Sequence, residues 1–177
     1  MVRLFIAVEP SNEIQTKIAE AGETLKGAGR LSFAKTEQMH ITLKFLGEVE
    51  ENKIPKIEEA LKQISGKPYR LTASKVSSFG RPPRVIKAEV NDGGESAKLA
   101  EQLEPLLANA GFPREDKKFS PHITIARVKE YSPSLEEKIS SLHDSEFGSC
   151  TINEIALKKS ILTPSGAIYD TIYSVKL

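Results

Sequence analysis

Two short stretches, far apart in the chain, share one pattern. Residues 40–43 read His-Ile-Thr-Leu, and residues 122–125 read His-Ile-Thr-Ile. Two of the three histidines lie in this pattern. Threonine makes up about 5% of the chain, so finding it two positions after two of three histidines is roughly a one-in-a-hundred coincidence. The repeated His-x-Thr-x motif therefore indicates an internal duplication rather than chance composition.

The spacing within each copy has a direct meaning on a β-strand. Side chains two positions apart point to the same face of a strand, and the residue between them points to the other. His40 and Thr42 then share one face, while Ile41 and Leu43 enter an apolar core. The second copy repeats this arrangement. Two such strands predict a cleft that receives two imidazoles and two hydroxyls.

The rest of the chain predicts helices and strands in mixed order. Ser11 is expected to cap a first helix, which ends at Gly27 and Gly29. Further helices are expected over residues 53–64, 95–110 and 133–141, and strands over 3–8, 40–46, 120–128, 152–162 and 168–176, with others within 69–90. This order predicts an α+β protein with antiparallel sheets and outer helices. No linker is long enough to divide it, so residues 1–177 are expected to form one domain.

Composition describes a globular chain of nearly balanced charge. Hydrophobic residues make up 39% and charged residues 28% of 177 residues, which excludes disordered and fibrous classes. The net charge is +1, so any binding to a nucleic acid must use local positive charge. Residues 1–8 are apolar but end at Glu9, which favours a first strand over a signal peptide, and no apolar run approaches a membrane span. The single cysteine, Cys150, indicates a reducing, cytoplasmic compartment.

Two imidazoles and two hydroxyls in one cleft suit the cleavage of a phosphodiester. One imidazole can remove a proton from water while the other protonates the leaving oxygen, because histidine titrates near neutral pH. Threonine hydroxyls can donate to the non-bridging oxygens. An ordinary strand histidine explains one His-x-Thr but not a matched pair. A metal site would need more ligands than two histidines, and no carboxylate or cysteine cluster accompanies them.

On these motifs and their flanks, the chain resembles the 2H phosphoesterase superfamily, and within it the RNA 2′,3′-cyclic phosphodiesterases, also called 2′-5′ RNA ligases. The resemblance covers nearly the whole chain. The stretches that carry it are residues 3–7, 40–47, 79–85, 119–127 and 160–169. It implies two pseudo-symmetric lobes around a central cleft, each with an antiparallel sheet and outer helices. It also implies activity without a metal or other cofactor.

The resemblance implies roles for the motif residues. His40 would donate a proton to the leaving ribose oxygen, and His122 would accept a proton from the attacking water. Thr42 and Thr124 would hold the phosphate. The expected substrate is RNA, or a nucleotide, that ends in a 2′,3′-cyclic phosphate, and the expected product carries a 2′-phosphate. We also expect a monomer that does not associate with membranes.

Five further residues are expected to contact substrate. Arg127 lies three residues after Thr124, and this odd spacing sends its side chain to the opposite face unless the strand bulges. Its assignment therefore depends on the resemblance alone. Arg81 and Arg84 are candidates for a basic rim, although solvated loop charges explain them equally well. Phe5 and Phe119 suit either the core or the stacking of a base.

Three other positions carry separate expectations. Strict alternation places Phe45 in the core. His143 lacks a threonine partner and is interpreted as a surface histidine. Lys87 stands where many relatives carry an aromatic residue, often tryptophan, which bears on how a base would stack.

Three functions remain open on the sequence. The first is hydrolysis of RNA 2′,3′-cyclic phosphates. The second is 2′-5′ RNA ligation, which is the reverse reaction in the same site. The third is a non-catalytic RNA- or nucleotide-binding module. The intact pair of motifs favours an enzyme, since a binding module has no chemical need for two imidazoles.

Overall fold

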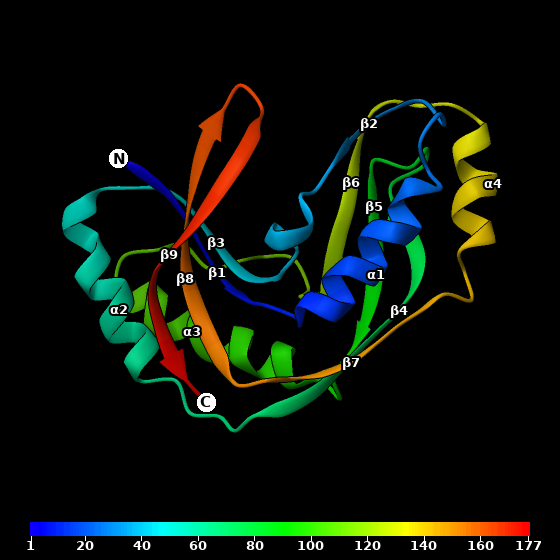
Figure 1. The fold of residues 1–177 in the computed structure, drawn as a ribbon. Coiled ribbons are helices and arrows are strands. Elements are labelled where there is room, and N and C mark those ends of the chain that lie inside the picture. Colours follow the sequence, from blue (N-terminus) through cyan, green and yellow to red (C-terminus); the bar gives the residue numbers. More distant parts are fainter.

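The computed structural model describes all residues from 1 to 177 and shows two lobes side by side (Figure 1). The elements in chain order are β1 Val2–Val8, α1 Asn12–Glu23, β2 Arg30–Phe33, η1 Thr36–Gln38, β3 Ile41–Val49, η2 Glu51–Lys53, α2 Ile54–Lys62, β4 Tyr69–Phe79, β5 Val85–Asn91, α3 Glu95–Asn109, β6 His122–Glu130, α4 Ser134–Ser141, β7 Glu146–Ile152, β8 Glu154–Thr163 and β9 Gly166–Lys176.

Each lobe is built on one antiparallel sheet. The sheet of the first lobe has the order β3-β1-β8-β9, and that of the second lobe has the order β2-β6-β5-β4-β7. Helices α2 and α3 contact the first sheet, while α1 and α4 contact the second (Figure 1). Both sheets are antiparallel throughout. The predicted α+β fold with two lobes is therefore confirmed.

Neither lobe is made from one continuous segment. The chain starts in the first lobe with β1, crosses to the second for α1 and β2, and returns for β3 and α2. Strands β4 and β5 then join the second lobe, and α3 packs on the first. Finally, β6, α4 and β7 complete the second lobe, and the β8–β9 hairpin completes the first. A single cluster of 34 buried residues draws members from both sheets. The two motifs thus lie in different lobes that share a core.

The local signals for helices were more reliable than those for two strands of the second sheet, β2 and β7. The Ser11 hydroxyl accepts from the backbone N–H of Ile14 at 3.3 Å, as expected of an N-cap. Helix α1 ends at Glu23, earlier than its glycines suggested, and turns fill the interval. Strands β2 and β7 were not predicted. Strand β2 has only four residues and none of them is fully buried, and β7 buries two of its seven residues, so the apolar pattern of both is weak.

Candidate active site

The two motifs begin strands at the boundary between the lobes. His40 immediately precedes β3, and His122 is the first residue of β6. Strands β3 and β6 contact each other across the lobes, and His122 is close enough for its charge to affect the pKa of His40. Ile41, Leu43 and their counterparts in β6 are buried in the shared core. The apolar residues of each motif therefore enter the core and leave the histidine and threonine outside it, which is the alternation expected of a strand.

The same backbone device orients both imidazoles. The Nδ1–H of His40 donates to the carbonyl oxygen of Gln38 at 2.7 Å, and that of His122 donates to the carbonyl oxygen of Ser120 at 2.8 Å. In each case the acceptor lies two residues before the histidine. This bond assigns the proton of the neutral ring to Nδ1 and leaves Nε2 to act as the acceptor.

The two Nε2 atoms differ in their partners. The hydroxyl of Thr42 donates to Nε2 of the neutral His40 ring at 2.9 Å. The Nε2 atom of His122 and the hydroxyl of Thr124 have no hydrogen-bond partner within the chain. His122 is therefore free to accept a proton from an incoming molecule, and the Thr124 hydroxyl is free to donate to one.

An aromatic cluster surrounds His40. Its ring centroid lies 4.8 Å from that of Phe5 and 5.5 Å from that of Tyr169. Burial lowers the pKa of His40, and the hydrogen bond to the Gln38 carbonyl opposes this shift. The carboxylate of Glu9 also raises the pKa of this ring, while the ammonium group of Lys158 lowers it.

His122 has a different electrostatic environment. Burial lowers the pKa of His122, the hydrogen bond to Ser120 opposes this, and the positive charges of Lys87 and Arg127 lower it further. Lys87 donates to the Ser77 hydroxyl at 2.8 Å, and its Nζ lies 4.7 Å from the centroid of the Phe79 ring. Two neighbouring cations thus favour the neutral form of His122, which is the form required of a base.

A β-bulge occurs at the same place in both motifs. In β3, Lys44 pairs with Ile6 and Thr42 pairs with Ala7, so that Leu43 has no partner. In β6, Ile125 is skipped in the same way between the partners of Ile86 and Lys87. An extra residue reverses the alternation of the side chains that follow it. The third residue after each threonine therefore returns to the face that carries the threonine.

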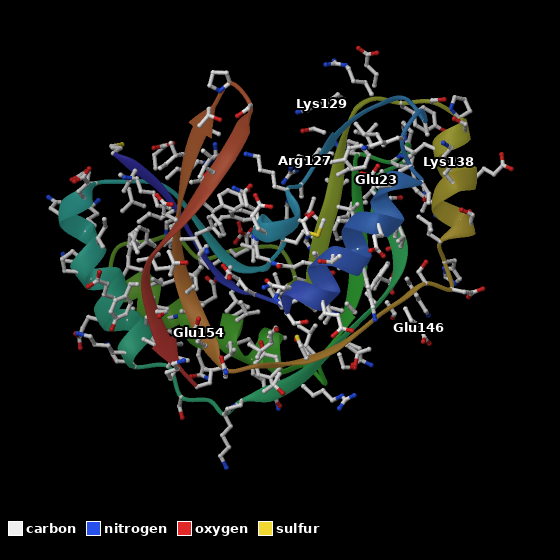
Figure 2. The ribbon with its side chains drawn as sticks, viewed as in Figure 1. Glu23, Arg127, Lys129, Lys138, Glu146 and Glu154 are labelled. Carbon is white, nitrogen blue, oxygen red and sulfur yellow. The ribbon has the colours of Figure 1, made fainter.

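These bulges correct one prediction and remove an objection to another. Phe45 is 64% exposed and its ring lies 6.3 Å from that of Phe5, so its assignment to the core was wrong. Arg127 is exposed and its charge acts on His122, despite its odd spacing from Thr124. Figure 2 shows Arg127 on the side of β6 that faces the first lobe.

The other predicted substrate contacts lie in varied places. Phe5 is buried, but it contacts His40 rather than the core cluster. Phe119 is half-buried and packs against that cluster. Arg81 and Arg84 are exposed in the β4–β5 loop, and Arg81 lines a surface hollow together with α4 and no motif residue. His143 is exposed, as predicted.

Three residues near His40 were not predicted as site residues. Glu9 follows β1, Lys158 lies in β8 and Tyr169 lies in β9, and none of them belongs to a His-x-Thr-x motif. Only the pairing of β1 with β3 and β8 and of β8 with β9 gathers them. The structure assembles no group of three or more His, Cys, Asp or Glu side chains that could hold a metal ion. None of its helices has the length and apolar character needed to span a bilayer.

Comparison with known proteins agrees with this geometry. The chain matches the family described as LigT like Phosphoesterase twice, over residues 8–87 and 90–169. Each match contains one motif. An RNA 2′,3′-cyclic phosphodiesterase of Archaeoglobus fulgidus is 36% identical over 170 residues, with 95% of this chain and 96% of the relative covered. One of Thermotoga maritima is 37% identical over 179 residues, with 97% and 94% covered.

A solved structure extends the likeness to the whole fold. The crystal structure of TT0787 of Thermus thermophilus superposes with a TM-score of 0.84 at 28% identity. The superposition covers 99% of this chain and 97% of that one. The repeated family match, the two-lobed fold and the paired motifs lead to one conclusion. The chain belongs to the LigT-like phosphoesterase family.

Proposed function

We propose that this protein hydrolyses the 2′,3′-cyclic phosphate at the end of an RNA to a 2′-phosphomonoester. The observation that carries the proposal is the matched pair of imidazoles, one in each lobe. Each is oriented by a backbone carbonyl two residues earlier, and each is followed two positions later by a threonine, whose hydroxyl bonds to Nε2 in the case of His40. A pair of this kind supplies both an acid and a base for displacement at phosphorus.

The two environments suggest which imidazole has which role. His122, beside two cations and with a free Nε2, accepts a proton from water as the water oxygen bonds to phosphorus. The bond from phosphorus to O3′ breaks, and His40 in its protonated form gives its Nε2 proton to O3′. The product has a 2′-phosphate and a free 3′-hydroxyl. The Thr42 and Thr124 hydroxyls and the Arg127 guanidinium stabilise charge on the non-bridging oxygens.

The relatives support the substrate class. The proteins of Archaeoglobus fulgidus and Thermotoga maritima that align over nearly the whole chain are named for activity on RNA 2′,3′-cyclic phosphates. We extend that substrate to this chain. We also propose that residues 1–177 act as one unit, that the protein is a monomer without a required cofactor, and that it works in the reducing cytoplasm, where Cys150 stays a thiol.

The test uses an RNA oligonucleotide that ends in a 2′,3′-cyclic phosphate. The expected product is the 2′-phosphate, identified by phosphorus NMR, and EDTA leaves the rate unchanged. His40→Ala and His122→Ala are each expected to lower kcat by at least about 10²-fold. His143→Ala, a histidine outside the site, serves as the matched control and keeps the rate.

Two results would reject the proposal. One is turnover that survives both histidine substitutions. The other is tight binding of the oligonucleotide without any turnover, which would identify a binding module instead.

A further inference from the structure

Glu9 and His40 each lie one residue beyond the last pair of the β1–β3 ladder, Val8 with Ile41. In the β1–β3 pair, Ala7 is the partner of Thr42 and Val8 is the partner of Ile41. Continued by one residue, this register sets Glu9 against His40. Glu9 is on the same face as Ala7, and His40 is on the same face as Thr42, because each pair is two residues apart. The carboxylate and the imidazole therefore share one face of the first sheet, and this face is close enough to the second lobe for His122 to act on His40.

Lys158 holds that carboxylate in place. Its Nζ binds the Glu9 carboxylate and donates to the hydroxyl of Thr171 at 2.7 Å. Lys158 is the partner of Phe5 in β8, two residues from Ala156, and Ala156 in turn pairs with Ala7. These two buried alanines are small, which leaves room for the lysine to extend across them toward Glu9. The Lys158 side chain is only 11% exposed, whereas that of Glu9 is 44% exposed.

The groups that face His40 carry both signs of charge. They are Glu9 from the end of β1, Lys158 from β8, Tyr169 from β9 and His122 from the second lobe. Only Glu9 is negative. Because Lys158 and the other histidine both disfavour a charged His40 ring, Glu9 is the one side chain that compensates for burial of that charge.

The second lobe contains a related residue with a different neighbour. Glu89 is the partner of His122 in the β5–β6 pair, as Glu9 faces His40. However, Glu89 lies 3.8 Å from Lys87, and its charge is not among those that act on His122. The two glutamates thus differ in their effect on the neighbouring histidine, because only Glu9 favours the charged ring, and this difference matches the acid and base roles proposed for the two histidines.

We propose that Glu9, held by Lys158 and Thr171, is a positioning residue that opposes the effect of burial on His40 and so raises the fraction of that ring that carries a proton for transfer to the leaving oxygen. This inference rests on the proposed function for the transfer itself. The effect of Glu9 on the His40 ring does not depend on turnover. Glu9 contacts no reacting atom and acts only through His40.

The test follows the three histidine rings by NMR as the pH is varied. Glu9→Gln is expected to lower the titration midpoint of His40 by about 0.5–1 pH unit, because it removes the negative charge and leaves that of Lys158. Lys158→Met is expected to raise the same midpoint. If the two substitutions only loosened the fold, the titration midpoint of His40 would shift in the same direction in both variants. His143 is the internal reference and keeps its midpoint.

Two matched variants control for net charge and for position. Glu154→Gln makes the same change in charge on β8, where Glu154 is 46% exposed and pairs with Lys176 away from the site (Figure 2). Glu89→Gln makes it at the related position of the second lobe. Neither is expected to move the His40 midpoint.

The pH–rate profile then connects the titration to catalysis. On a 2′,3′-cyclic nucleotide, the basic limb of kcat is expected to move to lower pH in Glu9→Gln and partly back in Glu9→Asp. At pH values above the midpoint of that limb, kcat of Glu9→Gln is expected to be about 3- to 10-fold lower than that of the unchanged protein. An unchanged His40 midpoint in Glu9→Gln, or shifts of the same sign in Glu9→Gln and Lys158→Met, would overturn the inference. Opposite shifts without any turnover would retain the electrostatic role of Glu9 and reject the proposed function.

Discussion

Replacing Lys44 by methionine is expected to destabilise the protein by about 3 kcal/mol. The residue follows the first motif, and the bulge at Leu43 turns it inward, where it is 6% exposed. Its Nζ donates to both carboxylate oxygens of Glu104 at 2.8 and 3.0 Å and to the carbonyl oxygen of Pro113 at 2.9 Å. It therefore ties β3 to α3 and to the segment that leads into the second motif.

The magnitude follows from what the substitution leaves behind. Methionine retains most of the apolar stem, so little packing is lost. The Glu104 carboxylate keeps only the N–H of Glu115, at 3.0 Å. Breaking a buried ion pair on one side costs roughly 3–5 kcal/mol, and the 22% exposure of Glu104 places this case at the lower end. At about 2–4 °C per kcal/mol for a chain of this size, Tm falls by about 6–12 °C.

Urea denaturation followed by circular dichroism measures the change. Glu104→Leu is expected to cost a similar amount, because it leaves the buried lysine without a counter-charge and with only the carbonyl oxygen of Pro113 as an acceptor. The double variant is expected to recover most of the loss, since no buried charge remains unpaired. A loss below about 1 kcal/mol for Lys44→Met would refute this reasoning, as would a double variant that equals the sum of the two single ones.

Three further predictions address the site. The free energy of unfolding should fall as the pH drops from about 6.5 toward the lowered pKa values of His40 and His122, because the unfolded chain binds protons more readily than the folded chain. Glutamine at both positions should flatten this dependence on pH, as measured by urea titrations. Phe45→Ala should change the free energy of unfolding by less than about 1 kcal/mol, whereas Leu43→Ala, which removes a side chain only 5% exposed, should cost about 2–4 kcal/mol. Equal losses would show that Phe45 is part of the core. Lys87→Met should move the acidic limb of the pH–rate profile to higher pH, since it removes a positive charge beside His122; an unmoved limb would contradict the role given to that charge.

Local pattern was enough for the helices, for most of the strands and for the chemistry of the motifs. Helical periodicity depends on residues three and four apart, and strand alternation depends on residues two apart, so both are visible in a short stretch. The same holds for the facing of His40 with Thr42 and of His122 with Thr124. Strand β2 was not predicted because it has only four residues, none of them fully buried, and so carries little apolar pattern.

What the chain by itself determined is the pair of imidazoles with their hydroxyls, because residue identity and the geometry of three consecutive strand residues suffice for that. Tertiary structure alone decided the rest of the site. A bulge depends on which residue the neighbouring strand leaves unpaired, so the exposure of Phe45 and the facing of Arg127 follow from β1 and β5. Glu9 meets Lys158 only because β1 and β8 lie side by side, 149 positions apart in the chain. Charges at such separation leave no local pattern, and only the pairing of the sheet brings them within reach of His40.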